Sequence, residues 1–301
     1  MKLNTCDCNH AVTNPTKTVI ILSRKPTLDS TKAEPDMREL VFIGLGLNDE
    51  NGISLAGLEE TKTADTIFAE LYTNLLPNLS FNRLTNLCGK KVTLLKRLDL
   101  EDHNGEALIQ AAKKGKTVLL VPGDPLIATT HMTLRLAAEK ANIRTRIVHG
   151  ASIISAAIGL SGLHNYKSGQ SVTIPFPENY SETPYKVVAQ NRKAGLHTLC
   201  LLDIDTERER YLTIKDSLET LLKIEEKRKQ EAFTQTSLAV GIARAGSKTP
   251  TVKADYAQKL LNQDFGAPPY CLIVPAELHF MEAEALVAFA GAPRELREKT
   301  A

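Results

Sequence analysis

The sequence has no long hydrophobic run and no strong excess of either charge. No apolar stretch approaches the roughly 18 to 20 residues that span a bilayer. The run from Thr18 to Leu22 is also too short for the core of a signal peptide. We therefore expect a cytoplasmic protein that does not engage a membrane.

The near balance of charge argues against one class of partner. The chain has 37 Lys and Arg residues against 35 Asp and Glu residues, a formal net charge of +2. A dedicated nucleic-acid binder normally carries a clear basic excess. We therefore expect no direct contact with nucleic acid.

The cysteines form neither a disulfide framework nor a metal cluster. They are odd in number and scattered, as is typical of reduced thiols. The segment from Cys6 through Cys8 to His10 lacks the second half of a closed zinc site. We expect no bound metal.

The chain is long enough for two domains. Residues 1–37 show little periodicity and predict a disordered N-terminal extension. From there, short β-rich runs alternate with amphipathic helical stretches, which is typical of an α/β protein. We predict an N-terminal α/β domain over 38–149 and a C-terminal α/β domain over 150–301.

The hydrophobic pattern also predicts individual elements. Strands are expected at 40–43, 66–70, 117–121, 144–148, 171–174, 197–202, 237–242 and 271–274. Helices are expected at 54–64, 106–114, 130–140, 183–193, 213–229, 252–260 and 281–290.

The glycine loop after the first strand lacks part of a dinucleotide fingerprint. Gly44 and Gly46 are present, but Asp49 stands where the third glycine belongs, and Glu50 adds a second acid that would repel phosphate. The pattern disfavours a nicotinamide or flavin site. It leaves open a simple glycine turn or a loop that lets a ligand approach the backbone.

The turn from Pro122 to Pro125 is not a phosphate-binding loop, because no Gly-Lys-Ser/Thr follows it. It does stand at the carboxyl end of a predicted strand, where open α/β sheets bind ligands. Asp124 could face a ligand with hydroxyls or positive charge, or it could hold the turn through its own hydrogen bonds.

No catalytic set is visible from spacing. The histidines at 131, 149, 164 and 197 are isolated, and we interpret each as a structural residue. No Ser-His-Asp or Cys-His arrangement can be assembled. The residues by themselves indicate a two-domain α/β ligand-binding protein that is an enzyme.

An ordered set of motifs resembles the diphthine synthases of archaeal type, which share the fold of the tetrapyrrole methylases. The matching stretches begin at Phe42, Glu70, Pro122, Ala151, Gly159, Gly195, Ala243 and Asp264. The Ala-Thr-Thr-His segment ending at His131 and the Gly-Leu-His-Thr-Leu segment from Gly195 are the most specific of them. The resemblance implies a two-domain class III methyltransferase fold with the cofactor site in the inter-domain cleft.

The resemblance also implies the cofactor, S-adenosyl-L-methionine, and its product S-adenosyl-L-homocysteine, with no metal. Position by position, the implied cofactor contacts are Leu47, Asp124, Ile127, Ser152, Ile153, Leu202 and Ala245. An eighth contact falls on Tyr270, where the family often has a histidine. A tyrosine there could stack on the adenine or donate its hydroxyl.

The implied reaction is methylation, up to trimethylation, of the amino group on the 2-(3-amino-3-carboxypropyl)histidine of translation elongation factor 2, a step of diphthamide biosynthesis. The implied enzyme is a homodimer. Its methyl donor is already activated, so positioning of the amine provides most of the rate, and no catalytic residue is assigned. The alternatives are a corrin-precursor methyltransferase of the same fold and a non-catalytic protein that binds S-adenosylmethionine.

Overall fold

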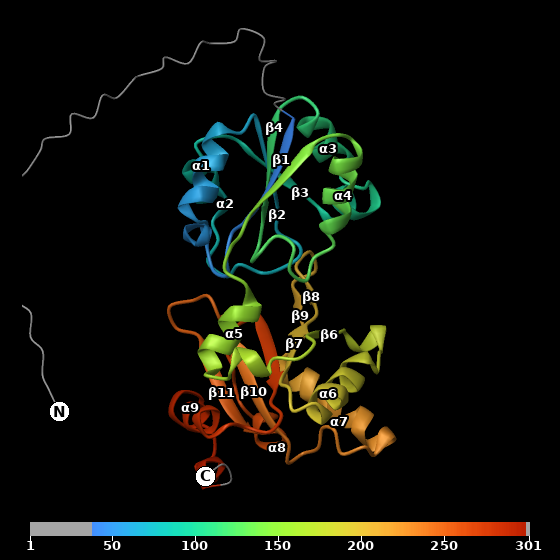
Figure 1. Cartoon of the computed structure of the whole chain (residues 1–301), viewed down its shortest axis with the longest axis vertical. Helices are drawn as coiled ribbons and strands as arrows, with labels where there is room; N and C mark the ends of the chain where they lie inside the picture. Colours follow the sequence, from blue (N-terminus) through green and yellow to red (C-terminus); the bar gives the residue numbers. More distant parts are fainter. Residues whose placement is uncertain (1–37, 299–301) are drawn as a thin grey trace, which may run out of the picture. The chain divides into compact units, whose positions relative to one another are not determined.

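Each half of the chain is organised around a five-stranded sheet of its own (Figure 1). The computed structural model describes residues 38–298. The predicted extension 1–37, with its Cys6–His10 segment, lies outside the described residues. Whether 38–149 and 150–301 are separate domains stays a prediction.

The first sheet is parallel throughout, in the order β3-β2-β4-β1-β5. Its strands are β1 (Glu39–Gly44), β2 (Thr66–Glu70), β3 (Val92–Leu95), β4 (Lys116–Val121) and β5 (Arg144–Val148). The two strands β1 and β4 are buried along almost their whole length. That is why both read as continuous apolar runs, since a parallel sheet is covered on both faces.

Helices cover both faces of this sheet, α1 and α2 on one face and α3 and α4 on the other (Figure 1). They are α1 (Leu55–Thr63), α2 (Phe81–Cys88), α3 (Glu106–Ala112) and α4 (Met132–Lys140), with short turns η1 (Glu50–Gly52) and η2 (Leu98–Asp102). Because all five strands are parallel, the loops that follow their carboxyl ends lie at the same edge of the sheet.

The second sheet is mixed, in the order β11-β10-β12-β7-β6. Only β6 and β7 pair in parallel, and the other neighbours are antiparallel. Its strands are β6 (Val172–Ile174), β7 (Thr198–Leu202), β10 (Leu238–Ala243), β11 (Thr251–Tyr256) and β12 (Tyr270–Val274), and a small hairpin joins β8 (Ile204–Asp205) to β9 (Arg210–Tyr211).

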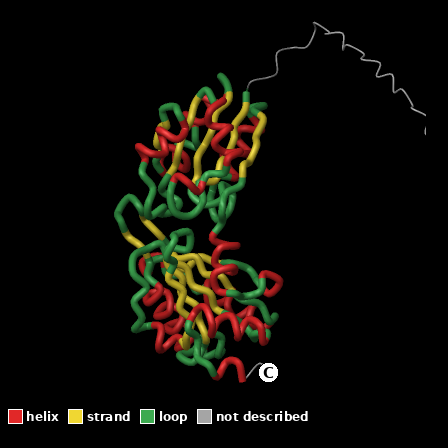
Figure 2. Tube along the Cα trace, turned by 90° about the vertical axis from the view of Figure 1, so that its left-hand side faces the viewer, coloured by secondary structure: helices red, strands yellow, loops and turns green. Residues whose placement is uncertain are grey.

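The second sheet is also sandwiched between helices, α5 and α9 on one face and α6 and α7 on the other (Figures 1 and 2). The remaining bounds are α5 (Ile153–Ser161), η3 (Asn165–Lys167), η4 (Pro177–Asn179), α6 (Thr183–Lys193), α7 (Ile214–Arg228), α8 (Ala257–Leu260), α9 (Phe280–Ala290) and α10 (Glu295–Glu298).

The predicted α/β class is confirmed, and one predicted helix is wrong. Residues 252–260 form strand β11 followed by the single turn α8. Val252, Tyr256 and Leu260 recur at helical spacing, but antiparallel pairing with β10 places 251–256 at the edge of the sheet instead. The pattern also misses α2, β3 and α5.

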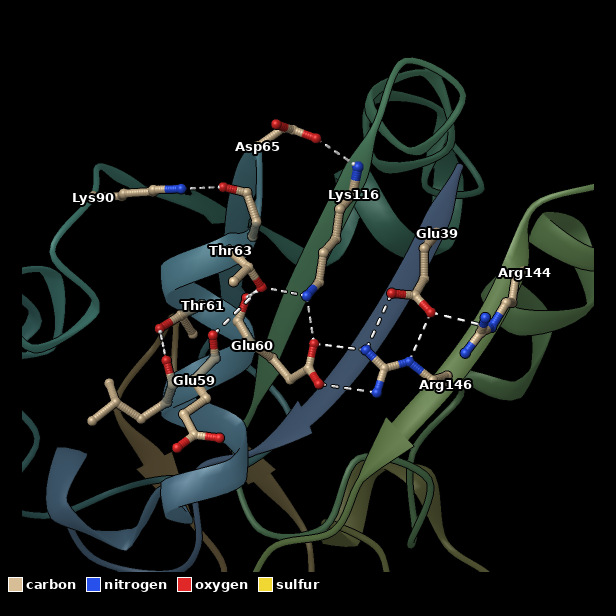
Figure 3. Close-up of polar contacts among 12 residues, drawn as sticks. Glu39, Glu59, Glu60, Thr61, Thr63, Asp65, Lys90, Lys116, Arg144 and Arg146 are labelled. Carbon is tan, nitrogen blue, oxygen red and sulfur yellow. Dashed lines mark hydrogen bonds and ion pairs between the residues drawn. The ribbon is translucent and has the colours of Figure 1, made fainter. Parts of the chain in front are cut away.

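A network of charges ties the first sheet together at its outer surface (Figure 3). The guanidinium of Arg146 on β5 donates two hydrogen bonds to Glu60 on α1, at 2.9 and 2.6 Å, and two to Glu39 on β1, at 2.7 and 3.1 Å. The Lys116 ammonium on β4 lies 2.6 Å from Glu60. Hydrogen bonds from Arg146, ahead of those from Lys116, hold the pKa of Glu60 at about 2 despite partial burial.

Residues 38–298 contain neither a membrane-spanning helix nor a cluster of metal-binding side chains. None of the helices there is both long and apolar enough to cross a membrane. Among the same residues, no three His, Cys, Asp or Glu side chains gather in a way that would hold a metal ion.

Candidate functional site

A cavity of about 570 Å³ opens where the loops after β1 to β5 meet residues of the second sheet. This size is in the range of small-molecule and cofactor sites. All eight side chains that the sequence assigned to one ligand line it. They are Leu47, Asp124, Ile127, Ser152, Ile153, Leu202, Ala245 and Tyr270.

Glycines allow three loops to meet directly beside this cavity. A Cβ on Gly44 would lie 2.5 Å from the carbonyl oxygen of Gly123, and a Cβ on Gly150 would lie 2.4 Å from the same oxygen. Gly46, with φ of +73°, pairs backbone to backbone with Gly123. The glycine loop is therefore a turn packed against protein backbone, and it carries Leu47 to the cavity wall.

Asp124 presents a mostly buried carboxylate to the cavity. Its side chain is 8% exposed, and Oδ2 lies 2.7 Å from Nδ1 of His149, whose own side chain is 75% exposed. A backbone hydrogen bond from Ile127 N to the Asp124 carbonyl helps to close the turn. One oxygen of the carboxylate is thus engaged by the exposed side chain of His149.

A residue of the cavity wall, Ala128, and a residue next to the wall, Arg244, adopt a backbone conformation that favours glycine. Ala128 has φ of +55° and Arg244 has φ of +52°. The Arg244 guanidinium is fixed by the carbonyls of Phe265 and Ala267 and by the Thr251 hydroxyl. Such strain is held in place by its surroundings and is concentrated at functional sites.

Tyr270 lines the cavity with its hydroxyl already engaged. The phenol donates to the carbonyl of Gly266, four residues earlier. Burial raises the pKa of this phenol. Of the two roles open to a tyrosine at this position, stacking is the one that leaves its internal hydrogen bond intact.

The histidines that the sequence analysis interpreted as structural differ in their contacts. His197 fits that interpretation fully: its Nε2 lies 2.9 Å from Glu282, and its Nδ1 accepts from Ala276 N. His164 lies 3.9 Å from the same glutamate. His131 is completely buried, with Nδ1 3.1 Å from the Pro125 carbonyl but no hydrogen-bond partner at Nε2.

Sequence patterns missed a polar group of cavity residues from the first half of the chain. They are Tyr72, Thr73, Asn74, Arg97, Glu101 and Thr130. The stretch Glu70–Thr73 is one of those that resemble the diphthine synthases, so the motif itself could have pointed to Tyr72 and Thr73 as residues of the site. Arg97 and Glu101 follow β3, a strand the hydrophobic pattern did not predict.

Residues 39–255 match the family model of tetrapyrrole (corrin/porphyrin) methylases. The match runs from β1 into β11 and includes the cavity-lining segments, except the one from Pro269 to Cys271. The chain belongs to this family and is a methyltransferase.

More similar relatives narrow the family. The diphthine synthase of Methanosarcina barkeri is 49% identical over 84% of this chain and 97% of its own. That of Methanosarcina acetivorans is 48% identical over 87% and 99%. A crystal structure of diphthine synthase superposes with a TM-score of 0.78 at 43% identity, covering 86% of this chain and 99% of that one. Within the methylases, the chain therefore belongs to the diphthine synthases, as the motifs predicted.

Proposed function

We propose that this protein uses S-adenosyl-L-methionine to methylate the amino group of 2-(3-amino-3-carboxypropyl)histidine in translation elongation factor 2. The observation that supports this most is the convergence of all eight assigned residues on one cavity. These residues come from loops far apart in the sequence, and only a shared ligand gives them a common purpose. Trimethylation and a homodimeric enzyme are part of the proposal.

The lining chemistry fits the cofactor. Leu47, Ile127, Ile153 and Leu202 offer apolar surface, and the Asp124 carboxylate offers negative charge. When bound, S-adenosylmethionine supplies a methyl group on a positively charged sulfur. A mostly buried carboxylate beside apolar walls suits a ligand that is part cation and part nucleobase.

The chain's own contribution to the reaction is alignment and exclusion of water. The acceptor nitrogen must be uncharged to attack, and it must be held near the methyl carbon in line with sulfur. The rigid turn that carries Asp124 and Ile127 fixes one wall for that alignment. The polar group around Thr73 and Arg97 lies in the same cavity, where it can face the charged groups of the acceptor.

One experiment tests the proposal. The protein is mixed with labelled S-adenosylmethionine and archaeal elongation factor 2 that carries the aminocarboxypropyl histidine, and the mass of the factor is followed. We expect increments of one, two and three methyl units, and none on a factor with unmodified histidine. Transfer to a corrin precursor instead, or binding of the cofactor without transfer, would overturn it.

A further inference from the structure

A buried acid and a buried histidine face each other behind one wall of the cavity. Glu70 is the last residue of β2, and His131 immediately precedes α4. Both side chains are 0% exposed. Neither residue has a part in the alignment of cofactor and acceptor proposed above.

The tautomer of His131 follows from its contacts. Nδ1 lies 3.1 Å from the carbonyl oxygen of Pro125, which can only accept, so Nδ1 holds the hydrogen of the neutral ring. Nε2 therefore presents a lone pair, 3.6 Å from Oε1 of Glu70 and with no hydrogen-bond partner. An unsatisfied buried nitrogen is costly, and a site that retains one calls for a reason.

Glu70 is connected to the cavity through a single hydroxyl. Its Oε2 accepts from the backbone N–H groups of Tyr72 and Thr73, at 3.0 and 3.1 Å. Its Oε1 accepts from the Thr73 hydroxyl at 2.5 Å. Thr73 also lines the cavity, so the residue whose hydroxyl binds the buried acid is itself part of the cavity wall.

Burial disfavours the charged form of both groups. Burial raises the pKa of Glu70 to about 7, against the hydrogen bonds from Thr73 and Tyr72. Burial likewise lowers the pKa of His131. The carboxylate of Glu101 faces both groups from η2, and Arg97 lies over the ring of Tyr72. An acid with such a pKa can both take up and release a proton under working conditions.

We propose that Glu70 receives the proton of the substrate ammonium through the hydroxyl of Thr73. One N–H bond of the ammonium breaks as Thr73 Oγ1 gains that proton, and the proton already on Thr73 passes to Glu70 Oε1. The nitrogen keeps the electron pair and becomes the nucleophile. Ammonium and carboxylate become amine and carboxylic acid, so atoms and charge balance. Before the next methylation, Glu70 releases this proton to water through the same hydroxyl.

This relay rests on the proposed function, and it matters most after the first methyl group. A free α-amino group has a pKa near 8, so roughly a tenth is neutral at pH 7 before it binds. Each methylation then leaves a new ammonium inside the cavity. A second or third methylation requires that proton to leave before the nitrogen can attack again.

Glu70→Gln and Thr73→Val test the relay. Glutamine can still accept the two backbone hydrogen bonds but cannot take a proton, and valine removes the linking hydroxyl. For both variants we expect methyl transfer at pH 7 to fall at least about tenfold, product to stop at the monomethyl stage, and the pH–rate profile to move up by about one unit.

The control is Glu50→Gln, which alters another buried acid of the first half, one that pairs with Arg83 outside the cavity. Its pH profile should match that of the parent enzyme. Cofactor affinity measured by calorimetry should be unchanged in all three variants, which shows that the cavity is intact.

Two results would overturn the relay while the parent enzyme is active. One is an unchanged pH profile and product ratio in Glu70→Gln. The other is an equal loss of rate at every pH, which indicates a structural role alone. If the parent enzyme itself transfers no methyl group, it is the proposed function that fails.

Discussion

The Asp124 carboxylate is engaged by a neighbouring side chain, and its backbone is part of a closed turn. That side chain is His149, and the turn is closed between Asp124 and Ile127. The sequence left open whether this acid holds the turn or meets a ligand. The structure shows that a backbone hydrogen bond closes the turn and that Asp124 lines the cavity.

Replacement of Asp124 by Asn should weaken the binding of S-adenosylmethionine about 10- to 100-fold, because a hydrogen bond to a charged group is worth about 1.5–3 kcal/mol. Isothermal titration calorimetry measures this directly. His149→Ala, which removes only the exposed partner, should cost less. If Asp124→Asn binds normally yet shows no turnover at any pH, the carboxylate acts on the acceptor and not on the cofactor.

The elements of the first sheet are joined by charge as well as by backbone. Arg146 connects β5 to β1 through Glu39 and to α1 through Glu60 (Figure 3). No sequence pattern predicts this contact, because the three residues lie up to 107 positions apart. Spacing reveals neighbours on one helix or strand, whereas this network depends on the order of strands in the sheet.

Arg146→Leu should lower the free energy of unfolding by about 1–3 kcal/mol, since it leaves two largely covered carboxylates without their main partner. Denaturant unfolding measures the change. Arg144→Leu is a matched control, because Arg144 contacts Glu39 from a side chain that is 72% exposed. Equal losses in the two variants would contradict the proposed difference.

The sequence revealed those elements whose burial leaves a clear pattern of apolar residues along the chain. Strands β1 and β4 are buried on both faces and read clearly as apolar runs. Helix α5 is small and apolar throughout, so it lacks the polar face that marks an amphipathic helix. Strand β11 lies at a sheet edge, where pairing with β10 decided a pattern that also fits a helix.

At the scale of the whole molecule, buried acids set how stability depends on pH. Glu282 is 0% exposed and accepts hydrogen bonds from the backbone of His279 and His164 and from the side chains of His197 and Lys167. Burial alone would raise its pKa, but these donors outweigh burial and lower the pKa to about 2. A carboxyl whose pKa is lowered by folding stabilises the fold at any pH above its pKa in the unfolded chain. That stabilisation is lost as the pH falls through the pKa of the folded state.

Glu282→Gln should therefore cost up to about 3 kcal/mol of unfolding free energy at pH 7, from a shift between 4.5 and about 2. The difference from the parent protein should shrink as pH falls from 4.5 toward 2. Urea unfolding at pH 7, 4 and 3 measures it. Glu284→Gln, on the same helix but with a 54% exposed side chain, should change little at any pH. A pH-independent deficit in Glu282→Gln would indicate lost packing instead.

The sequence predicted only part of the residues that line the cavity. The eight assigned residues were carried by motifs, and all of them line one cavity. Arg97 and Glu101 were not assigned, because they follow a strand that the hydrophobic pattern did not predict, and Thr73 was not assigned although it ends one of the matching stretches. Their significance appears only when the strand ends are brought to the same edge of the sheet.

Gly44, Gly123 and Gly150 form a contact of backbone against backbone beside the cavity. Backbone rests on backbone at this point, so the ends of β1 and β4 and the segment after β5 are locked as one unit. The chain leaves that unit at Gly150 and reaches Ser152 two residues later. The loop that carries Asp124 and the segment that carries Ser152 therefore meet through backbone atoms alone, and a side chain at Gly44 or Gly150 would force that contact apart.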